Sequence, residues 1–252
     1  MTHIEIKKVE TKKDLKKFID FHYELYKGSP YDVPNLFMDE MSTLSKDKNA
    51  AFEFCSAEYF MAYKDGKMVG RVAAIINNRA NERWEQKNVR FGWIDFIDDL
   101  EVSAALLDAV IEFGRKSGMT QIVGPLGFTD FDPEGMLVEG YDRLGTMALI
   151  YNHPYYPEHM KKHGYYKETG WIEYRITLPE MVSERHKRIA QAVMERYDLT
   201  IKKKTRSQIK KERYGQKLFN LINQTYCVLY GYSLLSEKQI DQYVGLYLSL
   251  ID

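Results

Sequence analysis

Residues Val89–Val123, which read VRFGWIDFIDDLEVSAALLDAVIEFGRKSGMTQIV, decide the fold class. The first part, Val89–Ile97, is apolar on both faces, which predicts a central strand. The carboxylates of 98–101 are typical of a helix start, and Gly118 of a helix end. Five apolar residues between them share one helical face: Val102, Leu106, Ala109, Val110 and Phe113. Met119–Val123 follows as another strand, so the order indicates an α/β protein.

Upstream of this unit, the sequence predicts a β-hairpin. The β-rich runs Ala57–Tyr63 and Lys67–Asn77 flank Asp65-Gly66, a strong signal for a two-residue turn. Before the hairpin, Ile4–Val9 alternates as a strand does. Thr11-x-x-Asp14 then resembles a capping box before a helix, and a weaker helix is expected over 35–44.

Downstream, the sequence predicts one more helix and a second hairpin. Asn152-His153-Pro154 opens the helix, and Gly164 closes it after a run of cations. Tyr165–Thr169 and Trp171–Leu178 then read as a hairpin, the second strand alternating apolar and polar residues. The whole order predicts a mixed α/β (α+β) fold over residues 1–178, with a central mixed sheet and helices on both faces.

Residues 179–252 are expected to be mainly helical. Leu199–Lys204 resembles Ile4–Val9, and each run precedes a helix, which indicates a weak internal repeat. Thr200–Lys217 holds eight Lys or Arg against one acid, a pattern typical of a solvated helix face. RNA is the weaker alternative partner, because Tyr214 is the only aromatic residue in this run.

Composition excludes several classes of protein. Lys plus Arg and Asp plus Glu both number 36, so net charge gives no reason to expect nucleic acid or an anionic membrane as the main partner. Two cysteines, Cys55 and Cys227, exclude a disulfide framework. The first residues contain no apolar leader segment, and no run is apolar enough to span a bilayer. We therefore expect a cytoplasmic protein.

The loop over 124–142 is the first candidate for a site. It is rich in Gly, Asp and Glu and is predicted to be a long ordered loop, and long loops in compact domains are often functional. Glu134 and Glu139 are candidate general bases, or, with the neighbouring aspartates, candidate ligands for a cationic substrate. The alternative is a solvated acidic loop.

No metal site is predicted. His159 and His163 lie one helical turn apart, a spacing that can hold a metal ion, but no carboxylate at helical spacing completes the usual set of ligands. His163 is explained equally well as a cation at the end of a helix.

Three stretches resemble a known family: NHPYYPEHMKKHGYY at Asn152–Tyr166, GPLGFTDFDPEGMLVEGYD at Gly124–Asp142, and YNHPYY at Tyr151–Tyr156. Together with the order of elements, they resemble the GNAT N-acetyltransferase superfamily, in particular an uncharacterised bacterial branch with tandem units. The resemblance implies a GNAT-like domain over 1–178 and the start of a second GNAT-like unit over 179–252.

The resemblance also implies a cofactor, acetyl-CoA or another acyl-CoA. The strands at Val89–Ile97 and Met119–Val123 would splay apart, and their free backbone groups would bind the pantetheine arm. The implied contacts come from two places: Trp93, Ile94, Asp95, Phe96 and Ile97 on the strand, and Asn152 and Tyr155 at the late helix. The sequence departs from the family at 98–101, where carboxylates replace the glycine-rich loop that receives the pyrophosphate.

The same resemblance implies a proton donor on the late helix. Family members carry a catalytic tyrosine four residues before the closing glycine, where this sequence has Met160. Tyr156, one turn earlier, is the candidate, with Tyr155 and His153 as alternatives. The predicted activity is transfer of an acyl group from a thioester to a small or peptidic amine. A binding or scaffold module without catalysis and an aminoacyl-tRNA-dependent transferase remain the alternatives.

Overall fold

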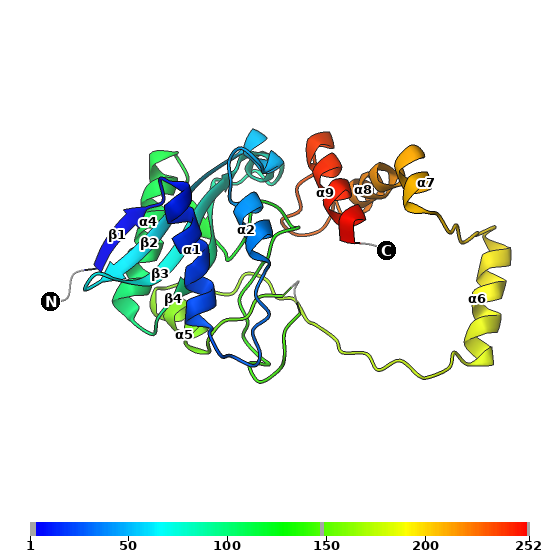
Figure 1. The fold of residues 1–252 in the computed structure, drawn as a ribbon, viewed down its shortest axis with the longest axis horizontal. Coiled ribbons are helices and arrows are strands. Elements are labelled where there is room, and N and C mark those ends of the chain that lie inside the picture. The colour runs from blue at the N-terminus through cyan, green and yellow to red at the C-terminus, as the bar shows by residue number, and fades with distance from the viewer. Residues whose placement is uncertain (1–3, 147–148, 251–252) are drawn as a thin grey trace.

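The centre of the molecule is a five-stranded sheet (Figure 1). The computed structural model describes residues 4–146 and 149–250. The strands lie side by side in chain order: β1 (Ile4–Lys8), β2 (Cys55–Lys64), β3 (Lys67–Asn77), β4 (Asn88–Phe96) and β5 (Gln121–Val123). The first four pair antiparallel, whereas β5 runs parallel to β4. This mixed sheet confirms the predicted fold class.

The predicted hairpin forms between β2 and β3. Its turn residues, Asp65 and Gly66, have φ angles of 50° and 76°, and Lys64 pairs with Lys67 across the turn. Two consecutive positive φ angles are what a two-residue turn needs to match the twist of its strands.

Helices cover both faces of the sheet, as predicted (Figure 1). On one face lie α1 (Lys12–Leu25) and α2 (Phe37–Thr43), and on the other lie α4 (Leu100–Lys116) and α5 (Tyr155–Lys162). Strand β3 serves both cores, because its side chains alternate: Ala73 and Ile75 pack on the α1 side, and Val72, Ala74 and Ile76 on the α4 side.

The helices begin and end where the sequence predicts. The side chain of Thr11 accepts a hydrogen bond from the backbone N–H of Asp14, and the Asp14 carboxylate accepts one from the backbone N–H of Thr11, which completes the capping box of α1. Asp99 caps α4 by accepting from the N–H of Glu101. Past the end of α4, Gly118 has a φ of 76°, the left-handed conformation that follows many helices.

Strand β4 carries a bulge that re-aims its side chains. Arg71 pairs with Asp95 and Ala73 with Gly92, so two residues of β4 lie opposite one of β3. Trp93, inside the bulge, has a φ of 44°, a strained conformation for so large a residue. Strand β5 pairs with β4 only over 88–90. The pairing of the two strands therefore ends before the bulge.

A long loop follows β5. Among its described residues, 124–146 and 149–154, none forms a helix or strand. The N–H of Leu126 donates to the carbonyl of Phe91, and the N–H of Gly135 to that of Pro125, so the loop is tied to β4 and to itself. Helix α5 then forms as predicted, and Gly164 after it has a φ of 84°.

Two predicted elements are wrong. Tyr165–Thr169 and Trp171–Leu178 form no hairpin, and Leu199–Lys204 forms no strand. Alternation specifies a face that can be buried, but a strand also needs a neighbour for its backbone groups, and none of the described residues pairs with these runs. Residues 165–183 are instead a long, outstretched connection (Figure 1).

The C-terminal part is mainly helical, as predicted. Its helices are α6 (Glu184–Arg196), α7 (Arg206–Lys211), α8 (Tyr214–Thr225) and α9 (Glu237–Leu250). Helices α8 and α9 pack around Phe219 and Ile240, with Phe131 of the long loop against them. Two short helices on the sheet domain contact this part of the chain: η1 (Ala50–Glu53) contacts α9, and α3 (Asn78–Arg83) contacts the segment between α8 and α9. Within the described residues, no helix combines the length and apolar character needed to cross a membrane.

Candidate functional site

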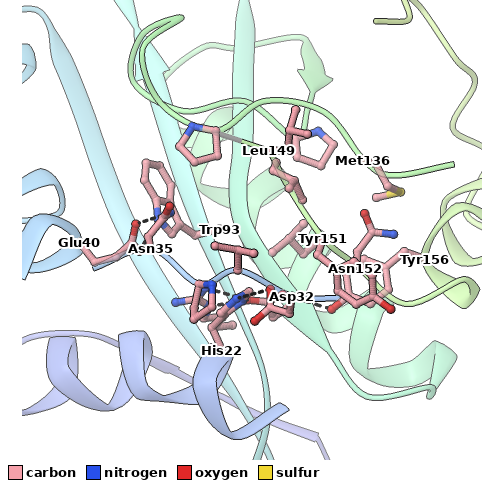
Figure 2. A pocket seen from close by; sticks show the side chains of 18 of the residues that line it. His22, Asp32, Asn35, Glu40, Trp93, Met136, Leu149, Tyr151, Asn152 and Tyr156 are labelled. Carbon is pink, nitrogen blue, oxygen red and sulfur yellow. Dashed lines mark hydrogen bonds and ion pairs between the residues drawn. The ribbon is translucent and has the colours of Figure 1, made fainter. Parts of the chain in front are cut away.

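A pocket opens beside the bulge of β4, between α1, α2 and the long loop (Figure 2). Its empty volume is about 780 Å³, part of which is open to solvent. The polar and aromatic lining residues are His22, Tyr23, Asp32, Asn35, Glu40, Arg71, Trp93, Asp95, Tyr151, Asn152 and Tyr156. The apolar ones are Ile19, Val33, Pro34, Ile94, Pro125, Pro133, Met136, Leu149 and Ile150.

Asp95 is the centre of the polar network in this pocket. Its side chain is buried. Its Oδ2 accepts a hydrogen bond from Nε of Arg71 at 2.7 Å, and the same oxygen lies 3.0 Å from Nδ1 of His22. The hydroxyls of Tyr26 and Tyr156 lie 3.3 Å from its Oδ1. Burial alone would raise the pKa of Asp95, but Arg71 and His22 outweigh burial and hold this pKa well below its usual range. The carboxylate is therefore ionised at neutral pH.

His22 links two carboxylates. Its Nε2 lies 3.4 Å from Oδ1 of Asp32, opposite the contact with Asp95. Burial would lower the pKa of the imidazole, but the charge of Asp95 and the hydrogen bonds to Asp32 and Asp95 prevail and raise this pKa to about 9. His22 is therefore a cation at neutral pH, and it offsets one of the negative charges around it.

Glu40 of α2 has different partners. Its Oε2 accepts a hydrogen bond from Nε1 of Trp93 at 2.7 Å, and its Oε1 accepts one from the side-chain amide of Asn35 at 3.0 Å. Glu40 is buried, and both of these donors are neutral. The strained backbone of Trp93 in the β4 bulge is what aims the indole at this carboxylate.

The end of β4, where β5 has parted from it, is capped by α5. The hydroxyl of Tyr156 accepts from the N–H of Phe96 at 3.0 Å, and the hydroxyl of Tyr155 donates to the carbonyl of Phe96 at 2.6 Å. The ring of Tyr156 stacks on that of Phe96 with centroids 4.2 Å apart. Two tyrosines thus occupy backbone groups that the GNAT resemblance assigns to the pantetheine arm.

Tyr156, the predicted proton donor, lines the pocket and is almost completely buried. Its hydroxyl lies 2.9 Å from that of Tyr26. Burial, then the charge of Asp95 and the contact with Tyr26, raise the pKa of Tyr156 well above its usual value. The phenol therefore keeps its proton at neutral pH.

The two predicted bases lie elsewhere. Glu134 is half-buried beside Asp130, and burial followed by that neighbouring carboxyl raises the pKa of Glu134 to about 8. Glu139 is exposed. Neither residue is among those that line the pocket, although Pro133 and Met136 of the same loop are.

Of the remaining predicted cofactor contacts, some line the pocket, whereas others hold the surrounding backbone in place. Trp93, Ile94 and Asp95 line the pocket. Ile97 donates its N–H to the carbonyl of Val69 and packs against the α4 core. Asn152 is buried and holds the long loop, because its Oδ1 accepts from the N–H of Leu137 at 2.7 Å and its amide donates to the carbonyl of the same residue.

The start of α4 does not fit the pyrophosphate of CoA. Asp99 occupies the N–H of Glu101 and pairs with Lys64, and the neighbouring Asp98 lies 2.9 Å from Nε2 of His159. A helix start attracts anions through its free N–H groups, and here carboxylates already fill that position. With the backbone of Phe96 also capped, the residues present do not fit CoA in the pose that the resemblance implies.

His159 of α5 and His163, which directly follows this helix, connect α5 to α4. Oγ of Ser103 lies 2.9 Å from Nδ1 of His159 and 2.7 Å from Nε2 of His163. Across residues 4–146 and 149–250, no group of three or more metal-ligating side chains is placed to hold an ion.

Sequence reasoning missed His22, Asp32 and Glu40 as members of one pocket. His22 lies four positions after Phe18 in α1, and a titratable residue at that spacing from a buried apolar one is a usable signal. Glu40 offered no such signal, because its burial depends on the indole of Trp93, which lies 53 residues away along the chain.

Comparison with known proteins finds two bacterial relatives in sequence. Protein YghO of Escherichia coli (strain K12) is 30% identical over 207 residues, which cover 82% of this chain and 51% of that protein. Bacterial ceramide synthase of Caulobacter vibrioides is 26% identical over 246 residues, 93% of this chain and 60% of that protein. The chain thus spans 51–60% of the length of these relatives. No family profile matches it.

The solved structures found by comparison include acetyltransferases, among them one of the GNAT family from Staphylococcus aureus. A predicted acetyltransferase of Clostridium acetobutylicum with acetyl-CoA has a TM-score of 0.42 at 10% identity, over 69% of this chain and 96% of that one. An aminoglycoside N-acetyltransferase in complex with CoA has a TM-score of 0.41 at 16% identity, over 71% of this chain and 97% of that one. The chain is similar to two bacterial proteins in sequence and to GNAT acetyltransferases in the search of solved structures.

Proposed function

We propose that this chain is part of an N-acyltransferase and that its pocket holds the amine that is acylated. The observation that carries the proposal is Glu40, a buried carboxylate in the pocket whose described hydrogen bonds come from the neutral groups of Trp93 and Asn35. The other two carboxylates, Asp32 and Asp95, already lie beside cations. A protonated amine would supply the positively charged partner that Glu40 lacks among these contacts.

The proposed chemistry uses two proton-transfer groups. A C–N bond forms between the amine and the acyl carbon while the bond from that carbon to the thiolate sulfur breaks. The protonated amine loses two protons in the reaction. Glu40 takes the first before the attack, and Tyr156, which gives its own proton to the leaving thiolate, takes the second. Glu134 and Glu139 remain predictions for the base, but neither lies in the pocket wall.

The walls of the pocket indicate the kind of amine. Ile19, Val33, Ile94 and Met136 are among the apolar residues that line it, so an amine with an apolar body fits better than a polar one. The name of one relative agrees with this, because a ceramide is the amide of a fatty acid with a long-chain amine.

Amine binding is tested with a charged and an uncharged probe of the same length. We expect n-octylamine to bind in calorimetry, and Glu40→Gln to weaken this binding about tenfold, since one uncompensated charge is removed. Binding of 1-octanol should not change. The exposed Glu24→Gln, also on the α1–α2 side, is the control. Equal affinity of the wild type and Glu40→Gln for octylamine contradicts the proposal.

The misfit at the start of α4 favours a second candidate, a binding module without transfer chemistry. The two candidates differ in product formation. Octylamine incubated with the protein and palmitoyl-CoA should give the amide, detected by mass spectrometry, if this chain catalyses transfer. Octylamine binding that depends on Glu40, without any amide, indicates the binding module instead.

A further inference from the structure

The segment Trp171–Leu178 has the sequence of a strand, but it pairs with no strand among the described residues. Its apolar side chains are strongly exposed: Ile172 at 77%, Tyr174 at 76%, Ile176 at 76% and Leu178 at 81%. They alternate with Glu173, Arg175 and Thr177. The chain here runs outstretched between α5 and α6, away from the sheet (Figure 1).

Such a segment is unstable by itself. Eight residues of unpaired backbone must rely on water for every hydrogen bond, and a row of exposed isoleucine, tyrosine and leucine side chains remains in contact with solvent. Edge strands normally avoid this with charges, prolines or short length. Trp171–Leu178 has no proline, and its two charges, Glu173 and Arg175, are of opposite sign.

We propose that two copies of the chain associate through this segment, with Trp171–Leu178 of each pairing antiparallel about a two-fold axis at Tyr174. The basis is the complementarity of the segment with itself. In this register Glu173 lies opposite Arg175 of the second copy, and Arg175 opposite Glu173, which makes two favourable pairs.

The apolar positions match in the same register. Ile172 lies opposite Ile176 of the second copy, and Tyr174 opposite itself, so both copies present their apolar row on one face of the pair. A shift by one residue would place Glu173 opposite Tyr174, so that the apolar row of one copy would face the polar row of the other, and a shift by two residues would place Arg175 or Glu173 opposite itself. Charge and shape therefore select one register.

The sheet edges of the same chain are poorer partners for this segment. Strand β5 offers three residues, Gln121–Val123, before the turn at Gly124-Pro125, against the eight of Trp171–Leu178. Strand β1 at the other edge carries Lys7 and Lys8, which protect it from further pairing. A second copy offers a strand of equal length with opposite charges in register.

A charge swap tests the proposal. We expect the 252-residue chain to dimerise in sedimentation equilibrium over a micromolar range of concentration. Arg175→Glu should raise the dimer dissociation constant about tenfold or more, because it turns both charge pairs into repulsive ones. The double variant Glu173→Arg/Arg175→Glu should restore the dimer. The exposed Arg188→Glu in α6, with the same change in net charge, should have no effect.

A monomeric wild type, or a double variant as weak as Arg175→Glu, would overturn the proposal. Circular dichroism shows whether each variant is folded. A cysteine cross-link supplies an independent measurement of register. In a Cys227→Ser background, Tyr174→Cys should form an intermolecular disulfide under mild oxidation, because residues on the two-fold axis face each other closely. Ser183→Cys should not, and equal cross-linking of both would also reject the register.

Discussion

At the scale of single residues, the pocket depends on how Asp95 is neutralised. A buried carboxylate is costly unless its charge is paired, and here Arg71 and His22 both contact Oδ2. Arg71 also donates to the carbonyl of Phe18, so it connects β3 to α1. The ion cluster thereby sets the distance between the helix and the sheet at the pocket floor.

Removing Asp95 should therefore destabilise the fold strongly. We expect Asp95→Asn to lower the free energy of unfolding by about 3–5 kcal/mol, because Arg71 is left as an uncompensated buried charge. Urea unfolding measures this change. Asp108→Asn on the exposed face of α4 is the control and should stay within about 0.5 kcal/mol of the wild type. Equal effects of the two variants would show that the cluster does not stabilise the protein.

His22 should make stability depend on pH. Its folded pKa, about 9, lies above the value of 6.5 for an unperturbed imidazole. A raised pKa means that the folded state binds the proton more tightly. Its stabilising contribution is thus complete below about pH 6.5 and is lost as the pH rises to about 9, by at most roughly 3 kcal/mol.

Urea unfolding of wild type and His22→Gln between pH 6 and 9.5 isolates this contribution. Glu134 and Asp132 also have raised pKa values, of about 8 and about 7, so the wild type should lose some stability from these groups as well. The difference between wild type and variant should shrink as the pH rises. A difference that stays constant over the range would rule out a charged His22.

At the scale of elements, the bulge of β4 decides the shape of the site. A Cβ placed on Gly92 would lie 2.5 Å from the backbone carbonyl oxygen of Leu126, so only glycine lets the long loop approach this strand. The bulge then turns Trp93 toward Glu40. Gly92 thus lets the long loop lie against β4, and Trp93 positions the carboxylate of Glu40.

We expect Gly92→Ala to push the long loop away from β4. The free energy of unfolding should fall by about 1–3 kcal/mol, the usual cost of overpacking, and octylamine binding should weaken because the loop forms one wall of the pocket. Gly245→Ala in α9 is the matched control. Its Cβ meets nothing within 4 Å, so stability should stay equal or rise slightly. Unchanged binding in Gly92→Ala would mean that the loop does not shape the site.

At the scale of the whole molecule, helices α8 and α9 are docked on the sheet domain. The chain that connects these helices to that domain is exposed. The side-chain amide of Asn77, at the end of β3, donates to the carbonyl of Phe128 and to Oγ of Ser233. Nε1 of Trp84 donates to the carbonyl of Tyr232. These contacts join α3, the long loop and the segment between α8 and α9.

Limited proteolysis should reveal this arrangement. Trypsin should cut first within 185–213, where α6 and its flanks are exposed and rich in Lys and Arg. The fragment with α8 and α9 should still elute with the sheet domain in size-exclusion chromatography, because buried contacts hold it. Separate elution of the two fragments would show that the docking is weak.

The sequence alone determined the elements that depend on short-range interactions. The turn at Asp65-Gly66, the capping box of Thr11 and Asp14, and the end of α4 at Gly118 all follow from the conformations and hydrogen bonds of neighbouring residues. The layered α/β order was readable for the same reason, because helices and strands carry their own periodicity.

Only the tertiary structure decided the pocket and the pairing of strands. His22 and Asp95 are 73 residues apart along the chain, and they meet because the register of β3 with β4 places Asp95 beside Arg71 under α1. The alternation of Trp171–Leu178 predicted a strand, yet no described strand adjoins it. A side-chain pattern states which face can be buried, but the partner that buries it depends on contacts between distant parts of the chain.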